Sequence, residues 1–168
     1  MDPDVTFLNH GSFGACPKPI FKNYQYWQKK LEHQPVLFFV DLVYRHLKKS
    51  RKTLSEFLGC SDNDIVFFQN PTTAISNIIY SLNLERGDQI LMSDHEYGAV
   101  VRAWKKWSGK VGVEVIEQPI SLPVSTKEKL IEDISKGITK RTKIIFISHI
   151  SSATALEFPV KEICDLAK

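Results

Sequence analysis

Apolar residues in the first third of the chain recur at the spacing of amphipathic helices. A loop-like segment at residues 7–17 comes first, with two glycines and a closing proline. Pro19 suits the first turn of a helix that runs to about His33, where a glutamine–proline pair stops it. An apolar stripe begins at Val36 and predicts a long helix with a basic outer face, which ends before Gly59.

Beyond residue 60 the period changes to short apolar runs that alternate with helical stripes. We predict four strands, at residues 65–68, 89–92, 113–116 and 143–148. The helices between them carry apolar stripes at residues 74–82, 100–107 and 130–134, and a last helix begins at Pro159. This alternation predicts an α/β fold with a mainly parallel sheet flanked by helices.

Local signals indicate where two of these helices begin or end. The helix with the 100–107 stripe is expected to end near Gly109. Ser125 and Glu128 have the spacing of a capping box, so we expect Ser125 to cap the helix that follows.

The change of period also divides the chain. We predict an N-terminal loop with helices at residues 1–60 and an α/β domain at residues 61–168. The helix from Pro159 has no later strand to which its crossover can return, so we expect this α/β domain to be incomplete.

Ligands of such sheets bind beyond the carboxyl ends of the strands. Three segments fall at that edge, residues 69–73, 93–98 and 149–158. The Asn-Pro-Thr-Thr start at residues 70–73 offers free N–H groups, the positive end of a helix dipole and two hydroxyls, which suits a phosphate. The same residues make an ordinary N-cap, and on this segment alone the cap is favoured. Tyr97 follows a strand, where its ring could stack on a planar ligand or simply pack.

Composition and charge exclude several classes of protein. The 168 residues are 43% hydrophobic and 24% charged, as in a globular domain, and the net charge of +3 is too small to indicate nucleic-acid binding. The longest apolar run, residues 36–40, cannot span a bilayer, and the N-terminus has no signal-peptide pattern. We therefore expect a cytoplasmic protein with neither nucleic-acid nor membrane partners.

Cysteine and histidine spacing argues against metal and disulfide chemistry. Cys16, Cys60 and Cys164 form no CxxC pair, so we expect buried or partly buried thiols in a reducing compartment. No HExxH motif is present, which leaves no predicted metal site. A hydrolase triad built on Asp94-His95 lacks the GxSxG elbow, and neither GxGxxG nor GxxxxGK[ST] occurs.

Four blocks in this order nevertheless form a specific set, at residues 7–14, 70–74, 87–99 and 148–163. The chain resembles the fold-type I pyridoxal-phosphate (PLP) enzymes of aminotransferase class V, and most closely the isopenicillin N epimerase-like branch. The resemblance covers essentially all 168 residues, with the spacing between blocks that the family shows. It implies that residues 61–168 are the N-terminal part of the family's large PLP-binding domain.

The resemblance also implies roles for particular residues. Thr72 and Thr73 match the family's phosphate-binding pair, and Tyr97 matches the aromatic position that stacks on the pyridine ring. Ser152 matches a position near the cofactor's 3′-oxygen that often holds asparagine. His10 and Gly11 match the loop over the substrate side of the site. The implied cofactor is pyridoxal 5′-phosphate, the implied substrate is an amino acid, and full-length relatives are expected to be homodimers.

In the family, an aspartate that pairs with the pyridinium nitrogen and the Schiff-base lysine both come later than the position of Lys168. Lys143 opens a strand and Lys161 lies along a helix, so neither takes over that role. We therefore predict no catalytic residue here and an inactive isolated chain. The resemblance implies a parent enzyme of the epimerase, transaminase or carbon–sulfur lyase type. Two alternatives stay open: a truncated non-catalytic interaction protein that keeps half of the fold, and a doubly wound module for another anionic ligand.

Overall fold

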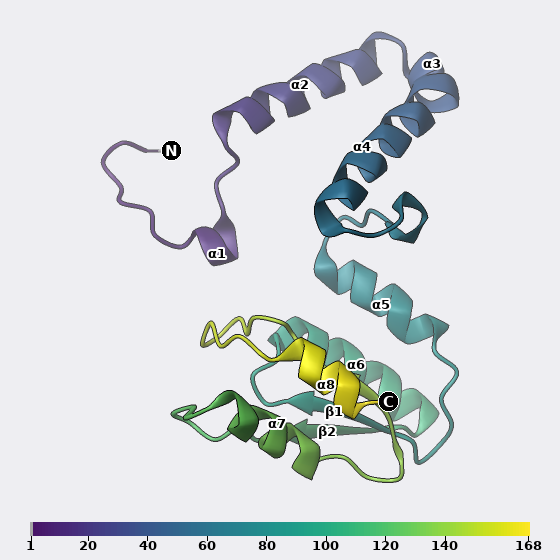
Figure 1. Ribbon diagram of the computed structural model, residues 1–168. Helices are drawn as coiled ribbons and strands as arrows, with labels where there is room; N and C mark the ends of the chain where they lie inside the picture. Colours follow the sequence, from purple (N-terminus) through teal and green to yellow (C-terminus); the bar gives the residue numbers. More distant parts are fainter. Residues whose placement is uncertain (1) are drawn as a thin grey trace. The chain divides into compact units, whose positions relative to one another are not determined.

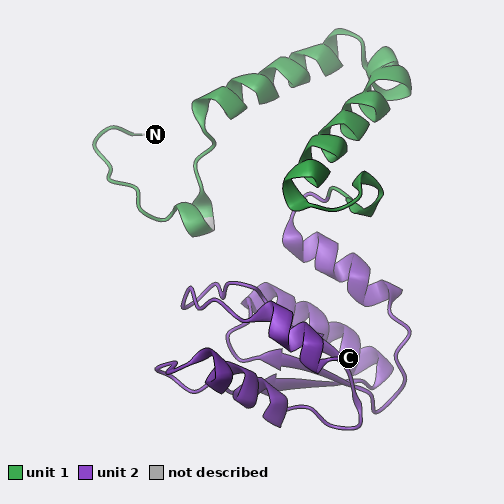
Figure 2. Ribbon diagram, viewed as in Figure 1, with its two compact units in different colours: residues 1–67 green, residues 68–168 purple. Residues whose placement is uncertain are grey.

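A computed structural model of the protein describes residues 2–168 and divides the chain into two compact units, as Figure 2 shows. Unit 1 is residues 1–67 and unit 2 is residues 68–168. Unit 1 is helical and unit 2 contains the sheet, so each is described by itself.

Unit 1 consists of helices joined by short turns. They are α1 (His10–Phe13), α2 (Lys18–His33), α3 (Pro35–Leu37), the π-helical turn η1 (Phe38–Leu42), α4 (Val43–Leu58) and the 3₁₀ turn η2 (Asp62–Asp64). The expected helix to His33 is confirmed, and the long stripe from Val36 folds as the run α3, η1 and α4. Gly59 ends α4 at a left-handed φ of 71°, where glycine pays no steric cost, and its N–H bonds to the carbonyl oxygen of Ser55.

The predicted strand at residues 65–68 is wrong. Ile65 has extended backbone angles, but no described strand pairs with this segment. Val66, Phe67 and Phe68 are all exposed. An apolar run becomes a strand only when a neighbouring strand accepts and donates its backbone hydrogen bonds, and the described residues supply none.

Unit 2 confirms the predicted α/β architecture. Its strands are β1 (Gln89–Ser93), β2 (Glu114–Gln118) and β3 (Thr142–Phe146), in the order β2-β1-β3, and both pairings are parallel. Its helices are α5 (Pro71–Ser81), α6 (Gly98–Val111), α7 (Lys127–Lys136) and α8 (Val160–Leu166). In Figure 1 α7 and α8 cover one face of the sheet, and α6 covers the other with α5 beside it.

Strand β1 is buried along its whole length because helices pack on both of its faces. Ile90 and Met92 point into the core under α5 and α6, and Leu91 points into the core under α7 and α8. The first core is Ile79, Ile90, Met92, Val100, Trp104, Trp107 and Val113. The second is Leu91, Ile120, Leu130, Ile134, Phe158 and Ile163.

Two predicted helix boundaries need correction. Helix α6 passes through Gly109 and ends at Gly112, whose φ of 79° and N–H bond to Ser108 O terminate it. The cap of α7 is Thr126 rather than Ser125: its hydroxyl accepts a hydrogen bond from Lys129 N at 3.1 Å. In both cases two adjacent or nearby residues suit the role chemically, and backbone angles decide between them.

The expectation of buried thiols is also wrong. Cys16, Cys60 and Cys164 are all free and exposed. In the part of the chain that the structure describes, no helix is both long enough and apolar enough to cross a bilayer.

Candidate functional site

The carboxyl edge of the sheet gathers the polar segments that the sequence singled out in unit 2. The segment after β1 leads into α6, and the segment after the neighbouring strand β3 leads toward α8. Figure 1 shows α5 and α6 side by side and running in the same direction, so the first turns of both lie at this edge. Ligands of parallel α/β sheets bind at this edge.

The first turn of α5 is an open, donor-rich end. Asn70 has extended backbone angles, and its side-chain oxygen accepts a hydrogen bond from Thr73 N at 2.8 Å. Pro71 has no N–H to satisfy, and Thr72 N has no acceptor within residues 2–168. The hydroxyls of Thr72 and Thr73 likewise have no hydrogen-bond partner among the described residues. Thr72 is half-buried and Thr73 exposed, so no bulky side chain fills the turn.

Tyr97 is the N-cap residue directly before α6. Its backbone is extended, and its carbonyl oxygen accepts hydrogen bonds from Val100 N at 2.8 Å and Val101 N at 3.1 Å. The residue is 52% exposed, so part of it is accessible to a ligand. It follows directly on the segment that leaves β1.

Ser152 lies in a turn with a defined internal structure. The buried Ser151 accepts a hydrogen bond from Leu156 N at 2.9 Å and contacts Thr154 Oγ1 at 2.7 Å through its hydroxyl. Ala155 completes the turn at a φ of 52°, which is unusual for a residue other than glycine. Ser152 itself is exposed, so its hydroxyl is presented to solvent on a turn that its neighbours hold.

Three consecutive side chains, none of them among the predicted site residues, tie these segments together. Glu96 accepts hydrogen bonds from Ser148 N at 3.0 and 3.1 Å and from Ser148 Oγ at 2.5 Å. His95 Nδ1 lies 3.0 Å from Thr154 Oγ1, and Asp94 Oδ1 accepts a hydrogen bond from Ile120 N at 3.1 Å. The signal in the sequence is a run of three polar side chains directly after the most buried strand.

His10 and Gly11 belong to unit 1, where they begin α1. The ring of Phe7 meets the imidazole of His10 edge-on, with 4.8 Å between the centroids. The structure thus places Thr72, Thr73, Tyr97 and Ser152 in one unit, and the other two predicted site residues in a different one.

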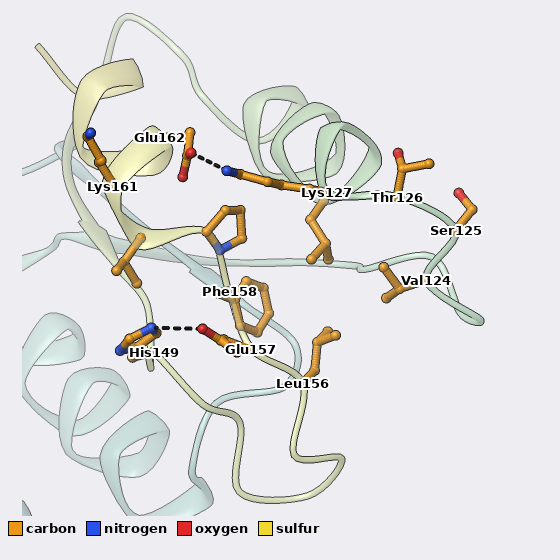
Figure 3. A pocket seen from close by; sticks show the side chains of 13 residues that line it. Val124, Ser125, Thr126, Lys127, His149, Leu156, Glu157, Phe158, Lys161 and Glu162 are labelled. Carbon is orange, nitrogen blue, oxygen red and sulfur yellow. Dashed lines mark hydrogen bonds and ion pairs between the residues drawn. The ribbon is translucent and has the colours of Figure 1, made fainter.

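A hollow lies between the start of α7 and the segment that leads into α8, and Figure 3 shows it from close by. Lys127 pairs there with Glu162 and lowers the pKa of that carboxyl below its ordinary value. His149 Nε2 lies 3.6 Å from Glu157 Oε1. None of the predicted site residues lines this hollow, and carboxylates already face Lys127 and His149. Within residues 2–168 no group of three metal-ligating side chains occurs.

A parallel sheet covered by helices on both faces, with hydroxyl-bearing and aromatic residues at its carboxyl edge, defines an α/β domain of the architecture whose ligands bind at that edge. Residues 22–168 match the family model described as Aminotransferase class-V, and the chain belongs to this family.

Comparison with curated proteins gives the same family. The chain is 24% identical over 181 residues to a probable chloroplastic L-cysteine desulfhydrase of Arabidopsis thaliana, covering 99% of this chain and 38% of the relative. It is 28% identical over 172 residues to an isopenicillin N epimerase of Amycolatopsis lactamdurans, covering 100% of this chain and 43% of the relative. The chain thus spans about two-fifths of the length of these relatives. The resemblance expected from the motifs is confirmed.

Solved structures confirm the fold. A complex of the cystine C–S lyase C-DES with its product cysteine persulfide matches with a TM-score of 0.82 at 20% identity, covering 98% of this chain and 43% of that one. A C-DES mutant with glycine covalently linked to its PLP cofactor matches with a TM-score of 0.81 at 19% identity and the same coverage. At these identities the likeness establishes the fold alone.

Proposed function

We propose that this chain supplies the phosphate-binding and ring-binding part of a pyridoxal 5′-phosphate site in an enzyme that acts on an amino acid. One observation carries the proposal: the donor-rich first turn of α5, Tyr97 and Ser152 belong to one unit and come from its carboxyl edge. Membership of the aminotransferase class V family supports the choice of cofactor.

The residues at the first turn of α5 fit the phosphate. The N–H of Thr72 and the hydroxyls of Thr72 and Thr73 have no competing partner in the described chain, and the turn is accessible. The helix dipole adds positive potential at the same place. These groups would bind the phosphate by charge-assisted hydrogen bonds, which are stronger than neutral ones.

The rest of the edge fits the ring. The half-exposed ring of Tyr97 can cover one face of a flat heteroaromatic, and the hydroxyl of Ser152 can bond to an oxygen on its rim. When bound, PLP supplies an electron sink for reaction at the α-carbon of an amino acid. The residues of this chain position the group, and His10 and Gly11 are proposed to lie over the substrate.

The reaction type stays within the range of the relatives, whose names include desulfhydrases and epimerases. We propose that the 168 residues alone do not catalyse, because no lysine occurs in the segments 69–73, 93–98 and 149–158. Lys143 lies in β3 and Lys161 in α8, both exposed. A homodimeric complete enzyme is proposed from the resemblance alone, and the expected cytoplasmic location is kept as a proposal.

The phosphate contact is tested by replacing Thr72 and Thr73 with valine and titrating PLP by equilibrium dialysis. Valine matches threonine in shape, so only the hydroxyl hydrogen bonds are lost. Each bond to a charged group contributes about 1.5 kcal/mol or more, so affinity should fall at least about tenfold per hydroxyl. Thr53→Val is the matched control, because its hydroxyl bonds the carbonyl of Lys49 within α4. Unchanged affinity in the double variant would refute the contact.

Borohydride reduction after incubation with PLP tests the absence of catalysis. Peptide mapping by mass spectrometry should find no single lysine that is stoichiometrically labelled. One stoichiometric pyridoxyl-lysine would overturn the proposal that the chain lacks a Schiff-base residue. If the unmodified chain binds no PLP at all, the alternative of a non-catalytic interaction protein is favoured instead.

A further inference from the structure

The segment Asp94–Glu96 leaves the central strand and is hydrogen-bonded to both neighbouring strand ends. We propose that its three side chains are positioning residues: they fix the separation between Tyr97 and the turn that carries Ser152, and so set the width of the cofactor site. The inference rests on the proposed function, because it concerns the geometry of the proposed cofactor site. It assigns no contact between these three residues and PLP.

Glu96 forms the strongest of the three links. Its carboxylate accepts hydrogen bonds from both the N–H and the hydroxyl of Ser148, and from Ser93 Oγ at 2.9 Å. Ser93 is the fully buried last residue of β1, and Ser148 follows β3. One side chain thus joins the ends of two adjacent strands, one residue before Tyr97. Hydrogen bonds to a charged acceptor are shorter and stronger than neutral ones.

His95 extends the connection into the Ser152 turn. Its imidazole lies 3.0 Å from Thr154 Oγ1, and Thr154 Oγ1 lies 2.7 Å from the buried Ser151 Oγ. The side chain of His95 is only 9% exposed, so packing restricts its rotation. Ser151 and Thr154, which flank Ser152 in the chain, are therefore connected through His95 to the segment that carries Tyr97.

Asp94 links the same segment to the other side of the sheet. Its Oδ1 accepts from Ile120 N at 3.1 Å, and its own N–H donates to Gln118 O at 3.1 Å. Asp94 Oδ1 also lies 3.6 Å from His95 Nε2. Links to β2 on one side and to β3 on the other leave the peptide before Tyr97 little freedom to shift.

The opposite edge of the sheet supplies a matched control. Glu114, at the start of β2, accepts hydrogen bonds from Gln89 Nε2 at 2.8 Å and from Arg141 NH1 at 3.1 Å. It therefore ties β1 and the residue before β3 to β2, as Glu96 ties strand ends at the carboxyl edge. A loss of general sheet stability should follow from either substitution, whereas a loss of cofactor geometry should follow only from the one at Glu96.

The experiment compares Glu96→Ala, Glu96→Gln and Glu114→Gln with the unmodified chain. Amide hydrogen exchange at Ser148 and Leu156 reports on the links, and dialysis together with the induced circular dichroism of bound PLP reports on the site. Glu96→Ala should speed exchange at Ser148, weaken PLP binding by about tenfold and reduce the dichroic signal. Glu96→Gln keeps one acceptor oxygen and should fall in between. Glu114→Gln should retain both the affinity and the signal.

Two failures have different meanings. If the unmodified chain binds no PLP, the proposed function falls, and the positioning role falls with it. If it binds PLP and Glu96→Ala binds equally well with an unchanged dichroic signal, the positioning role alone is overturned, even where exchange at Ser148 has increased. An equal loss of affinity in Glu114→Gln would also overturn it. Should Glu96→Ala fail to fold, Ser148→Ala removes one donor and is expected to show a smaller change of the same kind.

Discussion

Gly137 lies so close to the central strand that adding a single methyl group, as in Gly137→Ala, should destabilise the fold. It follows α7 with an ordinary φ of −81°, so its backbone does not require glycine. A Cβ built there would stand 2.8 Å from Gln118 Oε1 and closer still to Cδ1 of Leu91. Gln118 can move, but Leu91 is fully buried in β1 and cannot. The site has no room for the methyl group.

The magnitude of the cost follows from two opposed effects. Overpacking a closed core costs about 1–3 kcal/mol. Replacing a glycine by alanine restricts the unfolded chain, which stabilises the folded state by about 0.4–1 kcal/mol. We expect Gly137→Ala to lower the free energy of unfolding by about 1–2 kcal/mol, a fall of roughly 2–8 °C in melting temperature.

Thermal and urea unfolding followed by circular dichroism measure this effect, and Gly109→Ala is the control. Gly109 lies inside α6 with no atom within 4 Å of its virtual Cβ, so alanine should stabilise the helix by about 0.5–1 kcal/mol. Leu91→Ala deletes the clashing methyl groups, so its combination with Gly137→Ala should be less destabilised than the sum of the two. A Gly137→Ala protein as stable as the unmodified chain would refute the close contact.

Two further substitutions test the capping and the charges of unit 2. Asn70→Ala removes the 2.8 Å bond to Thr73 N and should cost about 1 kcal/mol in urea unfolding. Asn70→Asp should keep that stability but weaken PLP binding in dialysis, because a second anion would stand beside the phosphate; equal or tighter binding would contradict the site. Asp133 is buried, and hydrogen bonds from Lys136 and from Ser121 N hold its carboxyl pKa well below the ordinary value. Its stabilisation is therefore present above the unfolded pKa of about 3.9 and is lost as the pH falls below it. Asp133→Asn should be less stable than the unmodified chain at pH 7, and the difference between their urea midpoints should narrow below about pH 4. A difference that does not change with pH would contradict this.

The sequence predicted those elements whose signal is local. Strands β1, β2 and β3 were found because a strand covered by helices is a short apolar run between helical stripes. The segment at residues 65–68 shows the same pattern but forms no strand, because pairing depends on a distant partner. The choice between Gly109 and Gly112 as the end of α6 depended on a backbone angle that composition does not reveal.

Part of the candidate site could likewise be predicted from local sequence, and part could not. The first turn of α5 could be predicted, because an Asn-Pro-Thr-Thr helix start has its chemistry in adjacent residues. The links at Asp94–Glu96 could not, since the partners of Glu96 and His95 lie 52 and 59 residues further along the chain. Only the parallel pairing of β1 with β3 brings them together.

The proposed function depends above all on the binding of the PLP phosphate at the first turn of α5. The most direct test is a titration of the ¹⁵N-labelled chain with PLP, followed by amide chemical shifts. We expect saturable shifts at Thr72 and Thr73, with smaller ones at Tyr97 and Ser152. Inorganic phosphate should reproduce only the shifts at Thr72 and Thr73. Saturable shifts confined to the hollow beside Lys127, with Thr72 and Thr73 unmoved, would contradict it.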